Sequence, residues 1–297
     1  MKKKIITCLL STTLLIPAIA HAEETKATQN TTNASKITYA SNVSKKQGWI
    51  QERGNWYYYD KNGKKVTGWL TLNGKKYYLD KYSGIRETGW VPIKNEKTGV
   101  NSWYYFDPNT GEMKTGWVKV NGYWYFLKND GVRQTGWLNN GGKWYYLDSF
   151  GQMQTGRQSI NNVYYSFDKN SGAMQTGWVQ NYGSWYYYNN NGSEYKGWLN
   201  TGGKWYYLDS YGQMETGRRW IDNAYYCFDK NSGAMQTGWV QNYGSWYYYN
   251  NNGSEHTGWL NTGGKWYYLD SSGYMRTGWA LIDNKWYYFN SSGVWIG

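Results

Sequence analysis

The chain has 297 residues, of which Trp, Tyr and Phe make up 21%, and its 32 basic and 20 acidic residues give a net charge of +12. Leu, Ile and Val are sparse beside these aromatics, which argues against a conventional globular core. One of the two cysteines and one of the two histidines lie within the first 22 residues. The rest of the chain therefore cannot form a disulfide framework or a Cys/His metal cluster.

Residues 1–22 have the features of a secretory signal peptide. Three lysines at positions 2–4 precede a mostly apolar run over residues 5–19, and Ala20-His21-Ala22 fits the small-residue cleavage pattern. A membrane anchor needs about 20 apolar residues, more than this run provides. We expect cleavage after Ala22, which leaves 29 basic against 20 acidic residues, a net charge of +9.

Residues 23–47 consist mainly of Thr, Asn, Ser, Lys and Ala, with Tyr39 as the single aromatic. Such a segment cannot bury enough apolar surface to offset the entropy lost on ordering. We predict a flexible leader.

Residues 48–297 form an array of twelve units, each of which starts at a glycine that is usually followed by Trp. Self-similarity at a fixed short period is the signature of a repeat architecture. The spacing is 20 or 21 residues, except for one interval of 27, and the anchor glycines are Gly48, Gly68, Gly89, Gly116, Gly136, Gly156, Gly177, Gly197, Gly217, Gly238, Gly258 and Gly278.

Each unit has the pattern of a β-hairpin. A short strand such as residues 136–139 meets the turn "NNGG" and returns through "KWYYLD", whose aromatics suit a pleated surface. The Asp of "DSFG" is predicted to be a turn residue because of its offset from the following Gly; such residues are Asp60, Asp80, Asp148, Asp209 and Asp270.

A lone hairpin is marginal in water, so the units must stack on one another. The stretch "GGKWYYLDS" recurs every 61 residues, at Gly141, Gly202 and Gly263, which is a step of three units. The sequence therefore predicts an all-β solenoid of stacked hairpins, in which every third unit is equivalent.

Two units differ from the others in a selective way. After Gly156 and Gly217 the anchor Trp is replaced by Arg157 and Arg218, and in the same units the second-strand Trp becomes Tyr and the second Tyr becomes Ser166 or Cys227. Since side chains alternate along a strand, these positions share one face. We infer that this face has a task beyond packing, with repacking against a different neighbour as the alternative. Cys227 is expected to be a buried or half-buried structural residue.

Aromatic faces attract quaternary ammonium groups, at about 0.5 to 2 kcal/mol per contact, and also stack on sugar rings. One such site is weak, on the order of millimolar. Repeated sites gain affinity for a polymeric ligand, by about 10² to 10⁴ in total. The repetition therefore indicates multivalent binding.

The stretch "TGWLNTGGKWYYLDSSGYMRTGW" at residues 257–279 resembles the choline-binding, or cell-wall-binding, repeat of Gram-positive surface proteins and lysins. The resemblance extends over residues 48–297. It implies a left-handed solenoid with about three hairpins per turn, and choline sites between consecutive repeats that are walled by aromatics and sometimes by a Met. The implied ligand is the phosphocholine of teichoic acids.

Carried over by position, each implied site combines the anchor Trp and second-strand Trp of one unit with the second Tyr of the next. Junctions that lose an aromatic through Lys76, Ser166 or Cys227 are doubtful. The methionines three residues before an anchor are expected either to wall a site or to fill the core. The six complete sites are Trp49, Trp56 and Tyr78; Trp90, Trp103 and Phe126; Trp117, Trp124 and Tyr146; Trp178, Trp185 and Tyr207; Trp239, Trp246 and Tyr268; and Trp259, Trp266 and Tyr288.

We therefore expect a secreted, non-catalytic protein at the cell wall or cell surface of a Gram-positive bacterium, bound noncovalently to choline residues of teichoic acid. The leader offers no nucleophile with a base, no paired acids and no metal set, so an enzyme, a cofactor and a metal are not expected. Neither a nucleic-acid partner nor a transmembrane segment in the mature chain is expected. The alternative is a glucan- or oligosaccharide-binding repeat protein. Host or wall proteins as further partners, the oligomeric state and the biological role stay open.

Overall fold

The computed structural model describes residues 45–297, so the predicted signal peptide and nearly all of the predicted leader lie outside the described residues. The described part consists of 24 strands in twelve antiparallel hairpins, as predicted, and contains no helix that could cross a membrane. Hairpins 1 to 12 are β1–β2 (Gly48–Glu52 and Asn55–Tyr59), β3–β4 (Gly68–Leu72 and Lys75–Leu79), β5–β6 (Gly89–Lys94 and Asn101–Phe106), β7–β8 (Gly116–Val120 and Tyr123–Leu127), β9–β10 (Gly136–Asn140 and Lys143–Leu147), β11–β12 (Gly156–Ile160 and Val163–Phe167), β13–β14 (Gly177–Asn181 and Ser184–Tyr188), β15–β16 (Gly197–Thr201 and Lys204–Leu208), β17–β18 (Gly217–Ile221 and Ala224–Phe228), β19–β20 (Gly238–Asn242 and Ser245–Tyr249), β21–β22 (Gly258–Thr262 and Lys265–Leu269) and β23–β24 (Gly278–Ile282 and Lys285–Phe289).

Each hairpin forms a separate two-stranded sheet closed by a two-residue turn, apart from the longer tip between β5 and β6. In hairpin 5 (β9–β10) the turn is Gly141-Gly142, with φ of 61° and 75°. Two successive positive φ angles match the right-handed twist of the flanking strands, which explains the Gly-rich tips. The predicted turn role of the recurrent Asp is confirmed, since Asp148 Oδ1 accepts hydrogen bonds from the N–H groups of Phe150 and Gln152, both at 2.9 Å.

Consecutive hairpins are linked through one backbone position, which lies three residues before the next anchor glycine or, after the last hairpin, at Trp295. We call it the bridge position. Met275 occupies it in hairpin 11: it pairs with Leu269 at the end of its own hairpin, and its N–H donates to the carbonyl of Trp246 in hairpin 10 at 2.9 Å. The same bond, from a bridge residue to the second-strand position of the preceding hairpin, recurs at all eleven junctions. Its donors are Arg86, Met113, Arg133, Met153, Met174, Glu194, Met214, Met235, Glu255, Met275 and Trp295.

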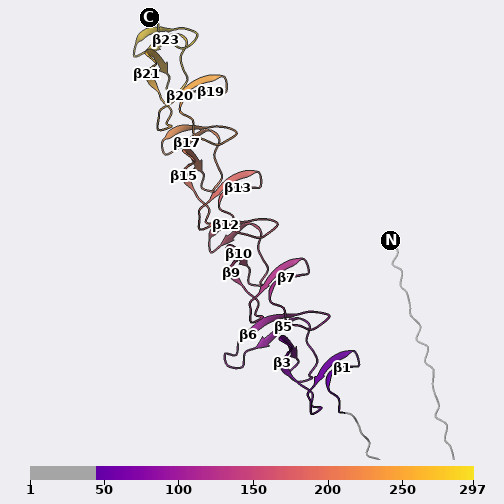
Figure 1. Cartoon of the computed structure of the whole chain (residues 1–297). Coiled ribbons are helices and arrows are strands. Elements are labelled where there is room, and N and C mark those ends of the chain that lie inside the picture. Colours follow the sequence, from indigo (N-terminus) through magenta and orange to yellow (C-terminus); the bar gives the residue numbers. More distant parts are fainter. Residues whose placement is uncertain (1–44) are drawn as a thin grey trace, which may run out of the picture. The chain divides into compact units, whose positions relative to one another are not determined.

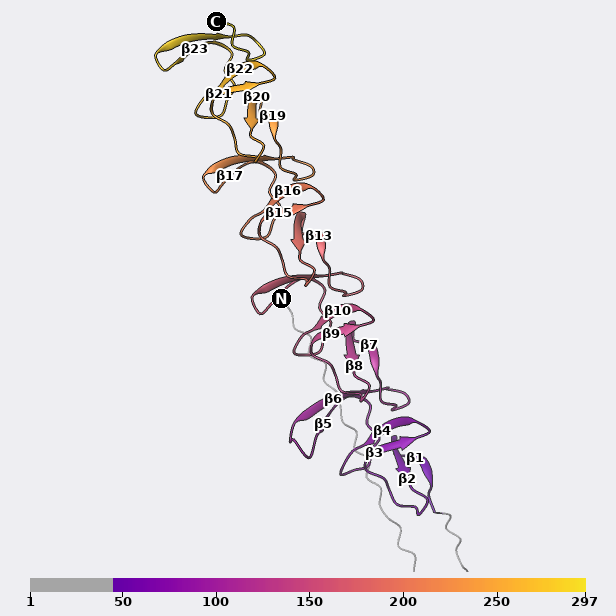
Figure 2. The same cartoon turned by 60° about the vertical axis from the view of Figure 1, so that its left-hand side comes forward.

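Every third hairpin projects in the same direction along the array, as Figures 1 and 2 show for the hairpins that begin with β1, β7, β13 and β19. This arrangement confirms the three-hairpin period predicted from the 61-residue repeat. Because a superhelical turn holds three hairpins, a residue can contact a loop that lies two units further along the chain.

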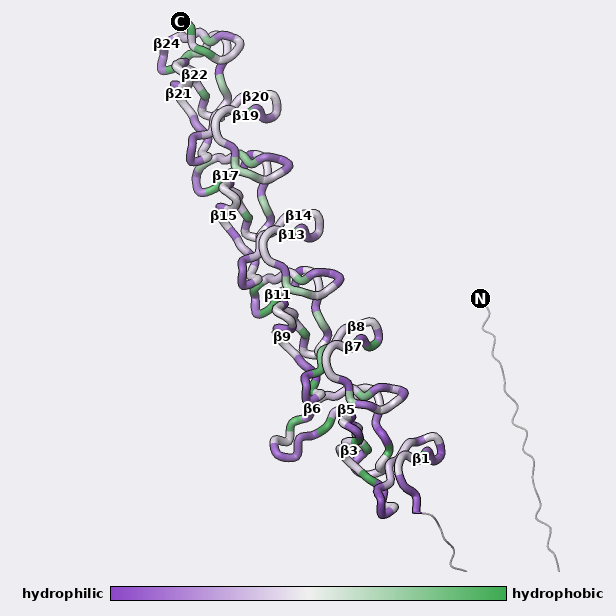
Figure 3. Tube along the Cα trace, in the orientation of Figure 1, coloured by the Kyte–Doolittle hydropathy of each residue, from purple (hydrophilic) through white to green (hydrophobic). Residues whose placement is uncertain are grey.

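The core is a series of small clusters, and Figure 3 shows hydrophobic residues only in short stretches of the tube. The last residue of the second strand is fully buried in hairpins 2 to 12. Cys227 is also buried, as predicted, and burial raises the pKa of its thiol. The fully buried strand-end residues are Leu79, Phe106, Leu127, Leu147, Phe167, Tyr188, Leu208, Phe228, Tyr249, Leu269 and Phe289.

Candidate ligand-binding cages

A hollow opens between hairpins 10 and 11, which we call junction 10, each junction taking the number of its first hairpin. Its walls are Trp239 and Trp246 of hairpin 10, Tyr267 of hairpin 11 and the bridge residue Met275. The rings of Trp239 and Tyr267 meet edge to face, with centroids 4.8 Å apart. Ser291 and Ser292, in the loop after β24, complete a cavity of about 390 Å³.

The same four walls recur at junctions 4, 5 and 7, around cavities of about 300, 390 and 270 Å³. Junction 8 has the same residues, and there the anchor Trp lies 4.6 Å from the tyrosine of the next hairpin. We call these five sites the open cages. Their walls are Trp117, Trp124, Tyr145 and Met153 (junction 4); Trp137, Trp144, Tyr165 and Met174 (5); Trp178, Trp185, Tyr206 and Met214 (7); Trp198, Trp205, Tyr226 and Met235 (8); and Trp239, Trp246, Tyr267 and Met275 (10).

The second-strand tryptophans of the open cages are accessible to a ligand. Their exposed fractions lie between 39% for Trp124 and 45% for Trp144, which is high for the largest apolar side chain. Aromatic surface left exposed at regular intervals marks a binding site rather than incomplete folding.

The third aromatic wall is the first Tyr of the next hairpin, so the prediction that its second Tyr completes the site is corrected. In hairpin 10 the register pairs Trp239 with Tyr248 and Val240 with Tyr247, which puts these two tyrosines on opposite faces. Successive hairpins are related by a rotation and a shift along the array, and such a relation brings the front face of one hairpin against the back face of the next. Like faces would meet only across a twofold axis. The two tryptophans of a cage therefore face the first Tyr.

The six second-position aromatics named from the sequence support their own anchor Trp instead. Each lies across the strand pair from that Trp, with ring centroids 5.1 to 5.3 Å apart, on the face of the following junction. The pairs are Trp69–Tyr78, Trp117–Phe126, Trp137–Tyr146, Trp198–Tyr207, Trp259–Tyr268 and Trp279–Tyr288.

With the first Tyr as the third wall, junctions 5 and 8 are complete as well. The sequence made them doubtful because Ser166 and Cys227 replace the second Tyr, but their cages use Tyr165 and Tyr226 and have every wall. Ser166 serves a different purpose: its buried hydroxyl accepts a hydrogen bond from Asn181 Nδ2 at 3.2 Å.

Each open cage draws on three consecutive hairpins, because the methionine packs against the loop of the third. A Cβ added to Gly293, whose φ is 78°, would come within 2.3 Å of Met275 Sδ. Glycine is therefore required where the loop crosses the thioether. Of the two roles considered for the methionines, cage wall and core filler, the structure assigns Met153, Met174, Met214 and Met275 to cage walls.

Comparison with known proteins matches the repeats to one family. The choline-binding repeat family matches residues 46–86, 114–154, 135–177, 195–237 and 256–295, and the putative cell wall binding repeat matches residues 176–193 and 237–254. The chain belongs to the choline-binding repeat family.

Solved structures from Streptococcus pneumoniae agree with this assignment. CbpJ is 33% identical, with a TM-score of 0.62, over 84% of this chain and 99% of that protein. Choline binding protein F is 30% identical, with a TM-score of 0.58, over 84% and 98%; it has also been solved with a peptidoglycan analogue and with ipratropium. The modular autolysin LytC shares the fold, at 24% identity and a TM-score of 0.54, over 84% of this chain and 52% of that one. No curated protein sequence matches the chain.

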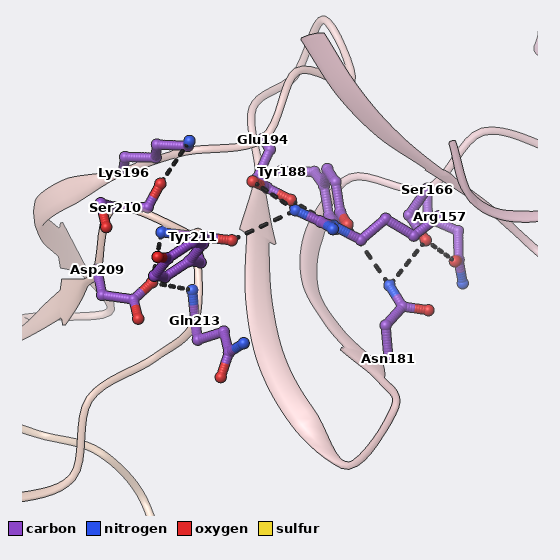
Figure 4. Close-up of polar contacts among 11 residues, drawn as sticks. Arg157, Ser166, Asn181, Tyr188, Glu194, Lys196, Asp209, Ser210, Tyr211 and Gln213 are labelled. Carbon is purple, nitrogen blue, oxygen red and sulfur yellow. Dashed lines mark hydrogen bonds and ion pairs between the residues drawn. The ribbon is translucent and has the colours of Figure 1, made fainter. Parts of the chain in front are cut away.

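Four junctions of these choline-binding repeats contain an arginine of the chain itself. At junctions 6 and 9 the arginine replaces the anchor Trp and a glutamate takes the bridge position. Arg157 Nε and Nη2 donate to Glu194 at 2.7 and 3.0 Å, and Nη2 also donates to the carbonyl of Tyr211, as Figure 4 shows. Arg218 pairs with Glu255 in the same way.

The guanidinium of Arg157 lies 3.7 Å from the ring centroid of Tyr164, where the open cages have their second Trp. Burial by itself lowers the pKa of Arg157, but the hydrogen bond and charge of Glu194 outweigh burial, so the pKa is raised. At junction 9 the hydrogen bond that Arg218 donates to Glu255 raises the pKa of the Arg218 guanidinium. Junctions 6 and 9 are thus filled by an ion pair, which gives a structural reason for the selective substitutions in these units.

The remaining junctions also depart from the open cages. Junction 2 has Lys76 in place of the second-strand Trp, as the sequence indicated, and its hollow of about 460 Å³ is lined by Trp69 and Tyr104 together with Lys81, Lys94 and Glu96. At junction 11 Trp295 takes the bridge position, 5.8 Å from Trp259. No group of three or more metal-ligating side chains is assembled within residues 45–297.

Proposed function

We propose that this protein is an exported, non-catalytic cell-wall protein that binds choline groups of teichoic acids noncovalently through its five open cages. The observation that carries the proposal is the repetition of one set of walls, two Trp, one Tyr and one Met, at junctions 4, 5, 7, 8 and 10.

The chemistry of the open cages suits a quaternary ammonium group. A primary ammonium needs hydrogen-bond acceptors for its three donors, whereas a trimethylammonium group has none to satisfy. The four cavities are walled by ring faces and a thioether, with Asn or Ser at the loop and without any carboxylate. Each ring contact contributes about 0.5 to 2 kcal/mol. Ipratropium, the ligand of one structure of choline binding protein F, is itself a quaternary ammonium compound.

Multivalency and charge favour a polymeric, anionic partner. A single cage binds on the order of millimolar, and five cages on one array gain affinity through effective concentration when the ligand is a polymer. A teichoic acid carries a phosphate beside each choline, so the net positive charge of the mature chain supports binding. The open cages contain no acid, base or nucleophile pair, so we assign them to binding rather than to catalysis.

The second candidate is a glycan, because tryptophan faces also stack on sugar rings. It is supported by the polar loop residues at the cage rim, such as Asn190 and Asn191 at junction 5, which can hydrogen-bond to hydroxyl groups.

A tertiary-amine resin in high salt tests the proposal. A basic protein does not bind a cationic matrix through its net charge, so the protein should be retained only through its cages and should elute with choline. The control replaces one Trp in each open cage by Ala, at Trp124, Trp144, Trp185, Trp205 and Trp246, and should pass through. Free passage of the unmodified protein, with retention on a glucan resin, would favour the glycan instead.

A further inference from the structure

Junctions 1 and 3 have the three aromatic walls of an open cage, but an arginine replaces the methionine. At junction 1 the walls are Trp49, Trp56 and Tyr77, and the anchor Trp lies 5.1 Å from the tyrosine. At junction 3 the corresponding distance, from Trp90 to Tyr125, is 4.8 Å. The anchor Trp lies 4.6 to 5.1 Å from the first Tyr at all nine junctions that have an anchor Trp. At junctions 1 and 3, which also have the second-strand Trp, only the fourth wall differs from an open cage.

The arginine follows the path of the methionine. The N–H of Arg86 donates to the carbonyl of Trp56 at 2.8 Å, which is the bond that Met275 makes to Trp246. A Cβ added to Gly111 would come within 2.5 Å of Arg86 Cδ, just as Gly293 crosses Met275. Arg133 and Gly151 repeat this contact at junction 3.

Beyond that shared path, the guanidinium ends near both tryptophans. The Cζ atom of Arg86 lies 5.9 and 5.7 Å from the ring centroids of Trp49 and Trp56. For Arg133 the distances to Trp90 and Trp103 are 5.7 and 5.5 Å. A cation within about 6 Å of a ring centroid is attracted by the ring face. Each guanidinium therefore takes the position that an open cage offers to a ligand cation.

These arginines are held less firmly than those of junctions 6 and 9. Arg86 donates to the carbonyls of Thr110 and Asn109 at 2.8 and 3.0 Å, and Arg133 to that of Ser149 at 3.4 Å. Neither forms an ion pair with a carboxylate within the described residues. The buried Nε of Arg86 has no hydrogen-bond partner, and burial lowers the pKa of both arginines.

We propose that Arg86 and Arg133 act as intramolecular ligands that close two otherwise complete choline sites, so that, where all three aromatic walls are present, the choice of Met or Arg at the bridge position decides whether a junction is open. A methionine leaves the cage open, and an arginine fills it with the chain's own cation. Junctions 1 and 3 are thus latent sites, whereas the ion pairs at junctions 6 and 9 keep those junctions closed. This inference rests on the proposed choline-binding function.

The methionine methyl groups provide one probe for each open cage, because Met153, Met174, Met214, Met235 and Met275 each belong to a different one. The experiment labels these methyls with ¹³C and follows their NMR shifts during titration with choline. The variants Arg86→Met and Arg133→Met each add a methyl group at a closed junction. The shift of each new signal should give a dissociation constant for choline within about threefold of the one that the Met275 signal reports for junction 10. Equilibrium dialysis should show one additional bound choline per variant.

The variant Arg276→Met is the control, since it adds a methyl at a half-exposed arginine that pairs with Asp270 at 3.6 Å and belongs to no cage; its signal should not respond. Removing Trp56 by Trp56→Ala should leave the number of bound cholines unchanged in the unmodified chain but lower it by one in Arg86→Met. If the new methyls fail to respond while Met275 does, arginine is not what closes these junctions and the inference is wrong. The same holds if Trp56→Ala alone removes a bound choline. If the Met275 methyl does not respond at all, the proposed function fails.

Discussion

Replacing Tyr267 by Ala should weaken choline binding at junction 10, whereas replacing its neighbour Tyr268 by Ala should leave that junction nearly unchanged. Tyr267 meets Trp239 at 4.8 Å across the junction, while Tyr268 lies 5.3 Å from Trp259 of its own hairpin. Loss of one ring contact with a cation costs about 0.5 to 2 kcal/mol, which corresponds to a roughly 2- to 30-fold higher dissociation constant.

The ¹³C-methyl signal of Met275 reports this effect at one cage. The choline concentration at the midpoint of its titration should rise in Tyr267→Ala and should stay within about twofold of the unmodified value in Tyr268→Ala. The Met153 signal at junction 4 serves as an internal reference in both variants. A larger effect from Tyr268→Ala than from Tyr267→Ala would show that the second Tyr contacts the ligand, and the assignment of the third wall would be wrong.

Breaking the ion pair at junction 6 should destabilise the array locally. The side chain of Glu194 is 2% exposed and that of Arg157 18% exposed. Removing one partner of a buried pair leaves an uncompensated charge and costs about 3 to 5 kcal/mol. In a repeat protein, stability is nearly a sum over neighbouring units, so the loss should fall on the hairpins around junction 6.

Hydrogen exchange measures this effect hairpin by hairpin. Arg157→Met should speed exchange of the amide protons in hairpins 6 and 7 much more than in hairpins 2 and 12. The double variant Arg157→Met with Glu194→Met should recover most of the protection, because no unpaired charge remains. Lys81→Met is the matched control, since Lys81 and Glu96 form an exposed pair worth at most about 1 kcal/mol. Unchanged exchange in Arg157→Met would mean that the pair does not hold the junction together.

The hairpins, their number and the period of three hairpins per superhelical turn could be predicted from the sequence. Gly-rich tips, alternating aromatics and the Asp turns act within about 20 residues, and the 61-residue repeat exposes the superhelical turn. The anchor and second-strand tryptophans could also be assigned to the cages from the sequence. In the two units that contain Arg157 and Arg218, the substituted positions all lie on the face that carries these tryptophans. These features depend on a single hairpin or on exact repetition.

The third wall of the cage could not be predicted in the same way, since it depends on how two hairpins meet. Face alternation correctly separates Tyr267 from Tyr268, but the choice between them requires knowing that unlike faces stack. The closing arginines left a signal that was missed. The bridge position of the eleven junctions is occupied by Met, Arg, Glu or Trp, and aligning these residues would have placed Arg86 and Arg133 beside the methionines of the open cages.

A crystal structure of the protein with choline would show which junctions hold the ligand and which side chains contact it. We expect a trimethylammonium group at junctions 4, 5, 7, 8 and 10, in contact with two Trp, the first Tyr of the next hairpin and the bridge methionine. Junctions 1, 3, 6 and 9 should retain their arginine and bind no choline. Choline bound away from these aromatic walls, or found equally at the arginine-filled junctions, would show that the open cages are not the choline sites.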